Sequence, residues 1–448
     1  MDTSVAVIGA GFAGCEAAWA LANMGFRVNL HEMKPHRYSP AHHYPGYAEL
    51  VCSNSFKASR LESAAGLLKA EMKLLGSLLV PCAERTSIPA GGALAVDRNH
   101  FSDMVTDIIR SHPNITIIEG EVTQIPKGPV VISTGPLTSQ RFSERIRELC
   151  GGEHLNFYDA AAPIVTLESI NQDKVFYAAR YGRGEDDYIN CPFSKEEYER
   201  FYQALINAET APLHDFEKDG RVYEGCMPVE VMARRGADTL RYGPMRPVGL
   251  RDPRTGARPW AVVQLRRENA EGSLYNLVGF QTNLKFAEQK RVFAMIPGLE
   301  HAEFIRFGVM HRNTFIDSPR LLDATFALRS NTQICFGGQI TGVEGYMESA
   351  ASGLLATIGL GRRLLRLPPL ILPNDTMTGA LSAYISDQSV AHFQPMGSNM
   401  GILPPLPERI KDKQERYLKI SLRSITSLKQ ALFDKKTFDT SAAINTPI

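Results

Sequence analysis

The sequence predicts an α/β protein: a Rossmann-like parallel sheet interrupted by an inserted α+β domain. Three observations lead to this prediction. Within its first 32 residues the chain passes through a strand, a glycine-rich turn, a helix and a second strand. A middle segment is then rich in loops and arginine. Near residue 331 the α/β pattern returns, and an apolar strand at 333–336 runs into a second glycine turn.

The first glycine turn has the spacing of a dinucleotide-binding fingerprint. After an apolar run at 4–8, the fingerprint consists of Gly9, Ala10, Gly11, Phe12, Ala13 and Gly14. The three glycines allow a tight turn, close approach of a pyrophosphate, and close packing of helix on strand. Glu32 ends the second strand, where a carboxylate can accept hydrogen bonds from an adenosine ribose. We therefore predict a bound dinucleotide; the alternative is a glycine-rich turn that binds nothing.

Composition limits the class of protein. The chain has 448 residues, 22% charged residues and a net charge of +1, which indicates two or three globular domains and no general attraction for polyanions. The seven cysteines are scattered without a CxxC pair or zinc spacing, as expected of free thiols in a reducing cytoplasm and of a protein without a metal site. We find no signal peptide or membrane span, so we expect a cytoplasmic protein with no membrane partner.

Periodicity places further elements along the chain. It predicts helices at 60–79, 101–111, 195–207 and 408–433, the third opened by a capping box at Ser194 and Glu197. Strands are predicted at 90–96, 115–122 and 130–133, and 234–267 is predicted to be mostly loop. From these changes of pattern we expect a first domain made of 1–165 and 306–448, with a C-terminal helix, and an insertion domain at 166–305.

The number of fingerprints decides between dinucleotides. Only one intact GxGxxG is present, whereas an enzyme with a second nicotinamide domain would normally show two. In flavoproteins of the glutathione-reductase type, a distant C-terminal strand and helix complete the sheet and meet the cofactor, and the turn at 337–342 suits that part. We therefore favour FAD with a transient nicotinamide donor over tightly bound NAD, and predict further cofactor contacts at Gly135, Gly338 and Gln339.

Two cysteines lie in polar segments suited to chemistry. Cys52 has no second cysteine within a few residues, which excludes a redox disulfide beside the flavin. Cys226 precedes Arg234 and Arg235, whose charge could lower a thiol pKa and favour a nucleophilic thiolate. From spacing alone, a small buried apolar role remains open for either cysteine.

The segment 234–267 carries nine arginines and two aspartates, a balance of 9 − 2 = +7. Interleaved with Tyr242 and Trp260, these arginines suit the phosphates of a structured RNA, with a solvated charged surface as the alternative. The candidate RNA contacts are Arg234, Arg235, Arg241 and Arg246.

Over nearly its whole length the chain resembles the bacterial folate- and FAD-dependent tRNA (uracil-5-)-methyltransferases. The segments that carry the resemblance are VIGAGFAG at 7–14, LVCSNSF at 50–56, PAGGALAVDR at 89–98, APIV at 162–165, YINCP at 188–192, EGCMP at 224–228, RRG at 234–236, VGFQT at 278–282, HRNT at 311–314, GGQITGVEGY at 337–346 and FQPM at 393–396.

The resemblance implies methylation of uridine C5 in the T loop of tRNA. The carbon donor would be 5,10-methylenetetrahydrofolate, with FAD as methylene carrier and reductant and NAD(P)H as electron source. Cys226 matches the position proposed to attack C6 of the base, and Cys52 matches the second functional cysteine. His311 and Arg312 become candidates for folate contacts. Two alternatives stay open: the same chemistry on a ribosomal RNA uridine, or an NAD(P)H-dependent flavin oxidoreductase acting on a small molecule.

Overall fold

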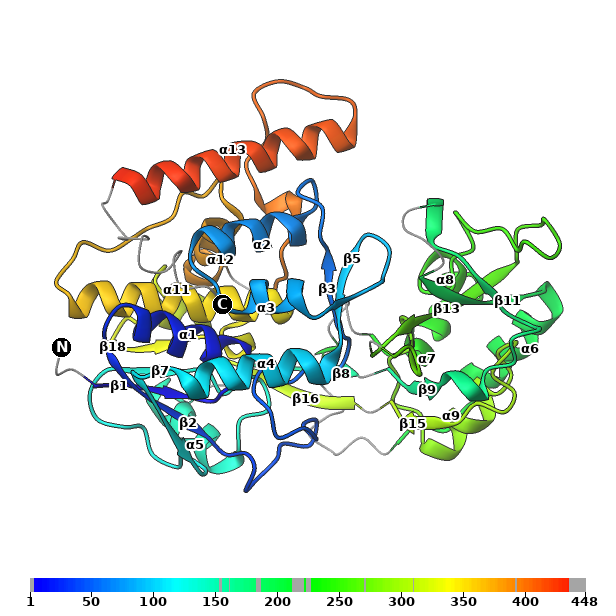
Figure 1. The fold of residues 1–448 in the computed structure, drawn as a ribbon, viewed down its shortest axis with the longest axis horizontal. Coiled ribbons are helices and arrows are strands. Elements are labelled where there is room, and N and C mark those ends of the chain that lie inside the picture. The colour runs from blue at the N-terminus through cyan, green and yellow to red at the C-terminus, as the bar shows by residue number, and fades with distance from the viewer. Residues whose placement is uncertain are drawn as a thin grey trace.

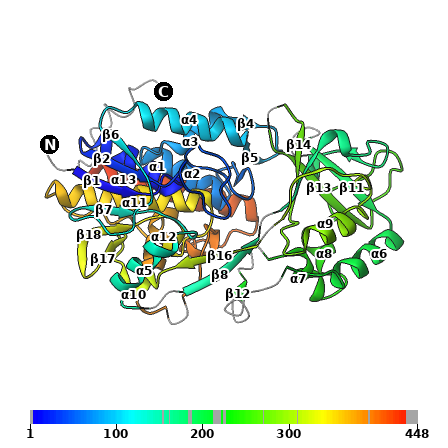
Figure 2. The same ribbon diagram turned by 90° about the horizontal axis from the view of Figure 1, so that it is seen from below.

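The computed structural model describes residues 4–152, 155–160, 162–182, 187–211, 221–222, 227–269, 271–308, 310–390 and 393–434. Its elements gather into two bodies that lie side by side in both ribbon views (Figures 1 and 2). One is built on a largely parallel sheet and the other, drawn in green, on an antiparallel sheet.

The first body is organised by a six-stranded sheet. In spatial order its strands are β17 (Ala327–Leu328), β18 (Asn331–Phe336), β7 (Val130–Ile132), β1 (Ser4–Ile8), β2 (Arg27–Glu32) and β6 (Ile115–Glu119). Only the pairing of β17 with β18 is antiparallel. The buried strands β1 and β7 are almost wholly apolar, as a sheet covered on both faces requires.

Two long helices pack together beside the centre of this sheet. Helix α1 (Phe12–Asn23) follows the first glycine turn, and α11 (Tyr346–Leu364) follows the second. They lie against each other and against β18, β7 and β1. Consequently, two glycine turns more than 300 residues apart in the chain reach the same edge of the sheet.

The remaining helices surround this core. They are α2 (Ala64–Leu74), α3 (Leu79–Arg85), α4 (Arg98–Ser111), α5 (Gln140–Leu149), α10 (Ser318–Leu321), α12 (Met377–Ser386) and α13 (Lys413–Asp434). Helix α2 contacts α11, α12 and α13, and Figure 1 shows α13 lying across it. A small antiparallel sheet of β3 (Ser55–Ala58), β5 (Ala93–Val96) and β4 (Ser87–Ile88) reaches from here towards the second body.

The second body has its own sheet and its own apolar core. The strand order is β10 (Phe176–Tyr177), β11 (Tyr188–Phe193), β13 (Ala261–Arg267), β14 (Leu274–Leu277), β9 (Ile164–Thr166) and β15 (Phe304–Arg306). Its helices are α6 (Lys195–Ile206), α7 (Val229–Arg234), α8 (Thr239–Tyr242) and α9 (Phe286–Phe293). The buried side chains of this body form a cluster separate from that of the first.

A three-stranded sheet lies where the chain passes between the two bodies. It is formed by β12 (Arg221–Val222), β8 (Leu155–Ala160) and β16 (Met310–Phe315), with β8 and β16 antiparallel. Figure 1 shows β8 and β16 between the two bodies. We propose that the bodies correspond to the predicted first domain of 1–165 and 306–448 and insertion domain of 166–305. Because β9 and β15 belong to the second sheet, the second body extends by a residue or two beyond the predicted bounds, to 164 and 306.

Most of the predicted elements are present, with shifted ends. The capping box at Ser194 and Glu197 is confirmed, since each side chain bonds the other residue's backbone N–H. The single helix predicted at 60–79 is wrong: Gly76, with a φ of +83°, separates α2 from α3. The prediction of mostly loop at 234–267 is wrong for 261–267, which forms the buried strand β13.

Candidate functional site

A deep cavity opens at the edge of the first sheet where both glycine turns meet. It encloses about 1130 Å³, including its open mouth. Nine of the predicted cofactor contacts line it, namely Gly9, Ala10, Gly11, Phe12, Ala13, Glu32, Gly135, Gly338 and Gln339. Gly14, the remaining one, lies one residue further into α1 and packs against the turn.

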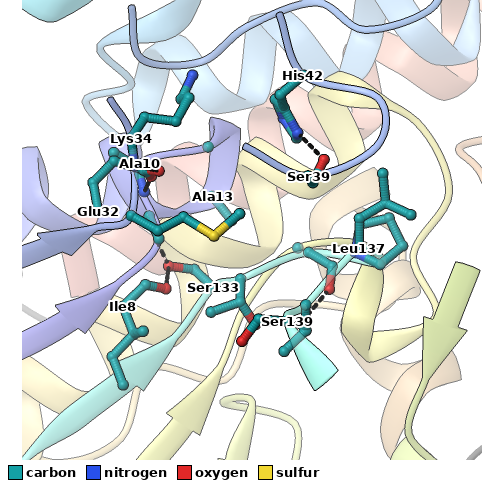
Figure 3. A pocket seen from close by; sticks show the side chains of 18 of the residues that line it. Ile8, Ala10, Ala13, Glu32, Lys34, Ser39, His42, Ser133, Leu137 and Ser139 are labelled. Carbon is teal, nitrogen blue, oxygen red and sulfur yellow. Dashed lines mark hydrogen bonds between the residues drawn. The ribbon is translucent and has the colours of Figure 1, made fainter. Parts of the chain in front are cut away.

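The Glu32 carboxylate is buried at the wall of this cavity, 7% exposed. One oxygen accepts the Ala10 N–H at 2.7 Å and the other accepts the Lys34 N–H at 2.9 Å. Glu32 thus fixes the glycine turn to the end of β2. An ionised carboxylate has further lone pairs, so these two bonds leave acceptor capacity for a ligand hydroxyl. Figure 3 shows Glu32 and Ala10 facing the cavity across from Leu137 and Ser139.

The space around the glycines of the turn shows whether a pyrophosphate can approach the backbone. A Cβ on Gly14 would lie 1.7 Å from the Gly9 carbonyl oxygen, so a larger residue cannot pack there. A Cβ on Gly11, in contrast, would meet no protein atom within 4 Å, because that side of the backbone faces open space. The amides at the start of α1 have no intrahelical acceptor and add a partial positive charge. The turn therefore fits the phosphates of a dinucleotide.

The distant wall of the cavity is formed by the second glycine turn. Gly338 has a φ of +89° and donates its N–H to Ser352 Oγ of α11 at 2.6 Å. The Gln339 side-chain amide donates to both oxygens of Glu344, at 3.0 and 2.9 Å. These bonds hold backbone and side chain at the cavity rather than in the solvent.

The loop at residues 33–50 also contributes to the wall of the cavity, which was not predicted from the sequence. Ser39 Oγ and His42 Nδ1 lie 2.5 Å apart, both lining the cavity (Figure 3). Burial lowers the pKa of the His42 imidazole, so this ring is neutral at pH 7. The Lys34 ammonium is buried and donates to the Tyr44 carbonyl at 3.0 Å and to the Gly46 carbonyl, which ties the loop down.

Cys52 lies beside this cavity and is bonded to Tyr346, the first residue of α11. The Cys52 N–H donates to Tyr346 Oη at 2.9 Å, and Cys52 Sγ lies 3.0 Å from the same oxygen. The Tyr346 ring stacks on Phe12 at 4.7 Å and lines the cavity. Burial raises the pKa of the phenol well above its usual value of 10, so the phenol keeps its proton and can donate a hydrogen bond to the sulfur.

The backbone around Cys52 is held by two arginines from different parts of the chain. Arg98 Nη2 and Arg306 Nη2 both donate to the Cys52 carbonyl, at 3.0 and 2.8 Å. Arg98, at the start of α4, is itself paired with Glu268 at 2.6 Å. Arg306, on β15, also donates to the Val51 carbonyl at 3.1 Å. The loop that carries the thiol is therefore held in place by the insertion sheet.

A third arginine extends this contact. Arg266, 8% exposed on β13, donates to Asn54 Oδ1 at 3.0 Å and to Ser53 Oγ at 2.6 Å. Asn54 in turn donates to the Arg267 and Val96 carbonyls, at 2.9 and 3.1 Å. The residues that follow Cys52 are thus bonded to both bodies at once.

Cys226 lies outside the described residues, so its distance from Cys52 stays open. The predicted RNA contacts that follow it fall into two groups. Arg234 ends α7 and Arg235 directly follows it; both are exposed, as is Arg246. Arg241 instead lies 3.7 Å from the centre of the Trp260 ring, bonds the Trp260 carbonyl at 3.1 Å and pairs with Asp238 at 2.6 Å.

The two predicted folate contacts are placed by their backbone. His311 and Arg312 lie on β16, opposite 159 and 158 of β8. The Thr314 N–H, two residues on, donates to the Pro136 carbonyl at 3.0 Å, which brings β16 to the Gly135 turn of the cavity. For these two residues the structure describes the backbone only.

Sequence reasoning missed Tyr346, Arg98, Glu268, Arg266 and Arg306 as parts of this site. Spacing gives no signal for any of them, because each acts on Cys52 or its neighbours from a distant segment. In the described residues no group of three or more His, Cys, Asp or Glu side chains could hold a metal ion. Nor does any helix among them have the length and apolar character needed to cross a bilayer.

Comparisons with known proteins identify relatives of this chain. A protein-family model described as "Glucose inhibited division protein A" matches residues 4–368. The chain is 57% identical over 425 residues to the methylenetetrahydrofolate–tRNA-(uracil-5-)-methyltransferase TrmFO of Acetivibrio thermocellus, covering 95% of this chain and 97% of that protein. It is 55% identical to the protein of the same name from Halalkalibacterium halodurans, covering 94% and 97%.

Among solved structures, the chain is similar to Aquifex aeolicus GidA in two crystal forms. The TM-scores are 0.69 and 0.68 at 16% identity, covering 98% of this chain and 75% and 77% of the GidA chains. At this identity the likeness establishes the fold alone.

Proposed function

We propose that this chain, which belongs to the family of methylenetetrahydrofolate–tRNA-(uracil-5-)-methyltransferases, methylates C5 of a uridine in the T loop of tRNA. The observation that carries the proposal is the meeting of a dinucleotide cavity with a thiol, that of Cys52, at the junction of two bodies. The names of relatives at 53–57% identity supply the substrate class.

The cavity is suited to FAD, because the glycine turn leaves room for a pyrophosphate and the Glu32 carboxylate can still accept hydrogen bonds from a ribose. We propose that the Gly9–Gly14 turn holds the pyrophosphate, Glu32 the adenosine ribose, and Gly135, Gly338 and Gln339 the rest of the cofactor. FAD held there would supply two-electron redox chemistry and transport of the one-carbon unit from methylenetetrahydrofolate, with NAD(P)H as the electron source.

The chain's own chemistry rests on its thiols. C5 of uracil becomes nucleophilic only after a thiolate adds to C6, and we assign that addition to Cys226. We assign proton transfer beside the cofactor to Cys52. Its sulfur lies 3.0 Å from the Tyr346 hydroxyl, which can donate a hydrogen bond to a thiolate or accept one from a thiol. Arg98 and Arg306 position this thiol by holding its carbonyl.

The surroundings complete the proposal. The exposed Arg234, Arg235 and Arg246 would bind tRNA phosphates, while Arg241 would support Trp260 from within. His311 and Arg312 would contact folate from β16, at the Gly135 side of the cavity. We also propose that the protein works in the cytoplasm, where tRNA and reduced thiols are found.

The deciding experiment incubates the purified holoprotein with unmodified tRNA, NADPH or NADH, and 5,10-methylenetetrahydrofolate labelled in its one-carbon unit. The expected result is label at C5 of a single T-loop uridine, dependent on each component. A parallel incubation with labelled S-adenosylmethionine should leave the tRNA unlabelled. Label that follows S-adenosylmethionine, or NADH oxidation that needs neither folate nor RNA, would contradict the proposal.

A further inference from the structure

The insertion sheet has one apolar face and one polar face. Val263 and Leu265 of β13 belong to the buried cluster to which α6, α7 and α9 also contribute. Side chains alternate along a strand, so Gln264 and Arg266 lie together on the opposite face, with their Cα atoms roughly 6.5 Å apart. Arg266 bonds the side chains of the two residues that follow Cys52. The polar face therefore adjoins the loop that carries this thiol.

Arg180 is attached to the polar face by neutral partners. Its Nε donates to Gln264 Oε1 at 2.6 Å and its Nη1 to the Val248 carbonyl at 2.8 Å, and no carboxylate of the described residues forms an ion pair with it. A guanidinium has more N–H donors than these two bonds use. Burial lowers the pKa of Arg180, and the positive charge of Arg246 lowers it further. The two arginines thus repel each other, and an anion bound by both would relieve that repulsion.

The next residue, Tyr181, presents an aromatic ring at the same place. It is 54% exposed, and its hydroxyl lies 3.4 Å from Arg246 Nη2. The ring packs on the backbone of Gly249, where a Cβ would lie 2.9 Å from it, and the Tyr181 N–H donates to the Gly249 carbonyl at 3.1 Å. The φ of Tyr181 is +59°, a strained value that persists only where surrounding contacts impose it. The protein therefore holds an exposed ring in a fixed position.

Arg180, Tyr181 and Arg246, which we call the arginine–tyrosine site, lie near the boundary between the two bodies. Tyr188 is opposite Arg266 in the sheet and donates its hydroxyl to the backbone carbonyl of residue 90, in the first body, at 3.2 Å. The carboxylate of the residue before it accepts the N–H of residue 91 at 2.5 Å, so this negative charge is also engaged at the boundary. The site and the Cys52 loop thus adjoin the same stretch of β13.

We propose that the arginine–tyrosine site binds a nucleotide of tRNA close to the target uridine, with the base stacked on Tyr181 and the phosphate bonded by Arg180 and Arg246. The inference rests on the proposed function, which supplies tRNA as the partner. Guanidinium groups match the charge and the geometry of a phosphate, and an exposed aromatic ring is a usual platform for an unstacked base. Any base can stack on such a ring, so this site adds affinity rather than sequence selection.

The test measures binding of an unmodified T-arm stem–loop RNA to the holoprotein over a range of salt concentrations. Arg180→Gln should reduce the slope of log K against log salt by about 1, because one phosphate contact is lost. Tyr181→Ala should bind about tenfold more weakly with the wild-type slope, because it removes stacking and no charge. Tyr181→Phe keeps the ring and should bind as wild type.

Two substitutions on the other side of the insertion sheet are the matched controls. Tyr177→Ala removes a 41% exposed ring of β10, which lies opposite Ile189 of the apolar face. Arg291→Gln removes an exposed charge of α9, whose next two residues belong to the same apolar cluster. Both variants should keep the wild-type affinity and slope.

A second arm uses wild type and so is independent of how a variant folds. Stem–loops are prepared with an abasic nucleotide at each position that neighbours the target uridine. Wild type should bind one of them about tenfold more weakly than the intact RNA, because the stacked base is missing. Tyr181→Ala should show no such difference at that position. Equal binding of the intact and all abasic RNAs by wild type would overturn the inference, as would wild-type affinity and slope in both Tyr181→Ala and Arg180→Gln.

NADPH carries the same combination of base and phosphate, so it is the other possible source of this chemistry. Flavin reduction by NADPH is therefore measured without RNA in the same variants, and the KM for NADPH should stay at the wild-type value. A tenfold higher KM with unchanged RNA binding would assign the site to the dinucleotide and overturn the inference. If wild type still transfers labelled carbon to tRNA in these cases, the proposed function stands and only this nucleotide site falls.

Discussion

Cys52 and Tyr346, 294 positions apart in the chain, share one oxygen atom: the Tyr346 hydroxyl accepts the Cys52 N–H at 2.9 Å and lies 3.0 Å from its sulfur. The Tyr346 ring also stacks on the ring of Phe12, a residue of the first glycine turn. Cofactor cavity and thiol are thus joined through one side chain.

Replacing Tyr346 by phenylalanine separates the packing of its ring from the hydrogen bonds of its hydroxyl. Tyr346→Phe keeps the ring that packs on Phe12 but leaves the Cys52 N–H without its acceptor, a loss of about 1–3 kcal/mol. We expect FAD to remain bound and the rate of ribothymidine formation to fall by tenfold or more. The checks are the flavin absorbance and single-turnover methyl transfer. Wild-type turnover in this variant would show that the hydroxyl has no part in the reaction.

The two thiols should differ in what their loss removes. Cys226→Ala should abolish methyl transfer and leave a yellow, folded holoprotein, because the thiolate that we propose to attack C6 is lost while the described residues that line the cofactor cavity are unchanged. Labelled-folate transfer to tRNA is the measurement. Cys15→Ala, at a thiol buried in α1 outside the proposed chemistry, is the control for a cysteine substitution and should keep activity. Normal ribothymidine formation by Cys226→Ala would end its assignment as nucleophile.

The exposed arginines of α7 should contribute to the salt dependence of tRNA binding. Replacing Arg234 and Arg235 by alanine would remove two proposed phosphate contacts, so the slope of log K against log salt should decrease by about 1 to 2. A matched double variant on α5, at Arg145 and Arg147, removes the same charge from the other body and should keep the slope. An affinity that does not change across several salt concentrations would exclude these arginines from the interface.

Substituting a glycine that lines the cofactor cavity should have a different effect from substituting a glycine at the contact between α1 and α11. Gly11→Ala places a methyl group in open space, so the apoprotein should keep its stability within about 0.5 kcal/mol while FAD binding is lost. Gly353→Ala places a methyl group 2.2 Å from the Ala13 carbonyl oxygen and forces α11 from α1, which should cost about 1–3 kcal/mol. Denaturant unfolding and flavin content distinguish the two effects. Gly92→Ala, also in open space but away from the cavity, should change neither.

Stability should depend on pH through Glu16, which is buried in α1. Burial raises the pKa of this carboxyl from 4.5 to about 7, although it accepts the Leu78 and Leu79 N–H groups at 2.9 and 3.0 Å. The unfolded chain loses the proton near pH 4.5 and the folded chain near pH 7. Its contribution to stability is therefore fully present below pH 4.5, falls as pH rises to 7, and is constant above that. The full drop is about 3 kcal/mol.

Glu16→Gln cannot ionise, so its free energy of unfolding should fall by about 2 kcal/mol less than that of wild type between pH 5 and 7.5. Urea unfolding at the two pH values measures this. Glu84→Gln, a half-exposed glutamate of α3, should behave as wild type. If Glu16→Gln and wild type lose stability equally, another group is responsible for the pH dependence.

Sequence patterns within a few residues correctly predicted several elements of the fold. The fingerprint predicted β1, α1 and β2, and the capping box predicted the start of α6, because turn glycines and caps act within a few residues. Strand β13 was missed because its two last residues are arginines, which resemble a surface segment. Arg266 is nevertheless buried, since Asn54 and Ser53 of the other body satisfy its donors.

The same limit applies to the site. Nine of ten predicted cofactor contacts line one cavity. Most of them lie in or next to glycine turns, whose backbone conformation is determined by residues only a few positions apart. The arginines and the tyrosine that hold the Cys52 loop could not be found from spacing, since their partners lie up to 294 positions away. A charge-based prediction also grouped Arg241 with the exposed arginines, although Trp260 and Asp238 engage it.

Glu71, a buried residue of α2, accepts hydrogen bonds from the Met377 and Thr378 N–H groups at 2.7 and 2.8 Å and from the Ser424 hydroxyl. β18, beside β7 in the first sheet, likewise arrives only at residue 331. A ribosome adds about 5–20 residues per second, so α2 and this sheet wait many seconds for their partners. The insertion, whose strands all lie between 164 and 306, can close its own core during that interval. The inserted part is therefore complete on the nascent chain before the part that encloses it.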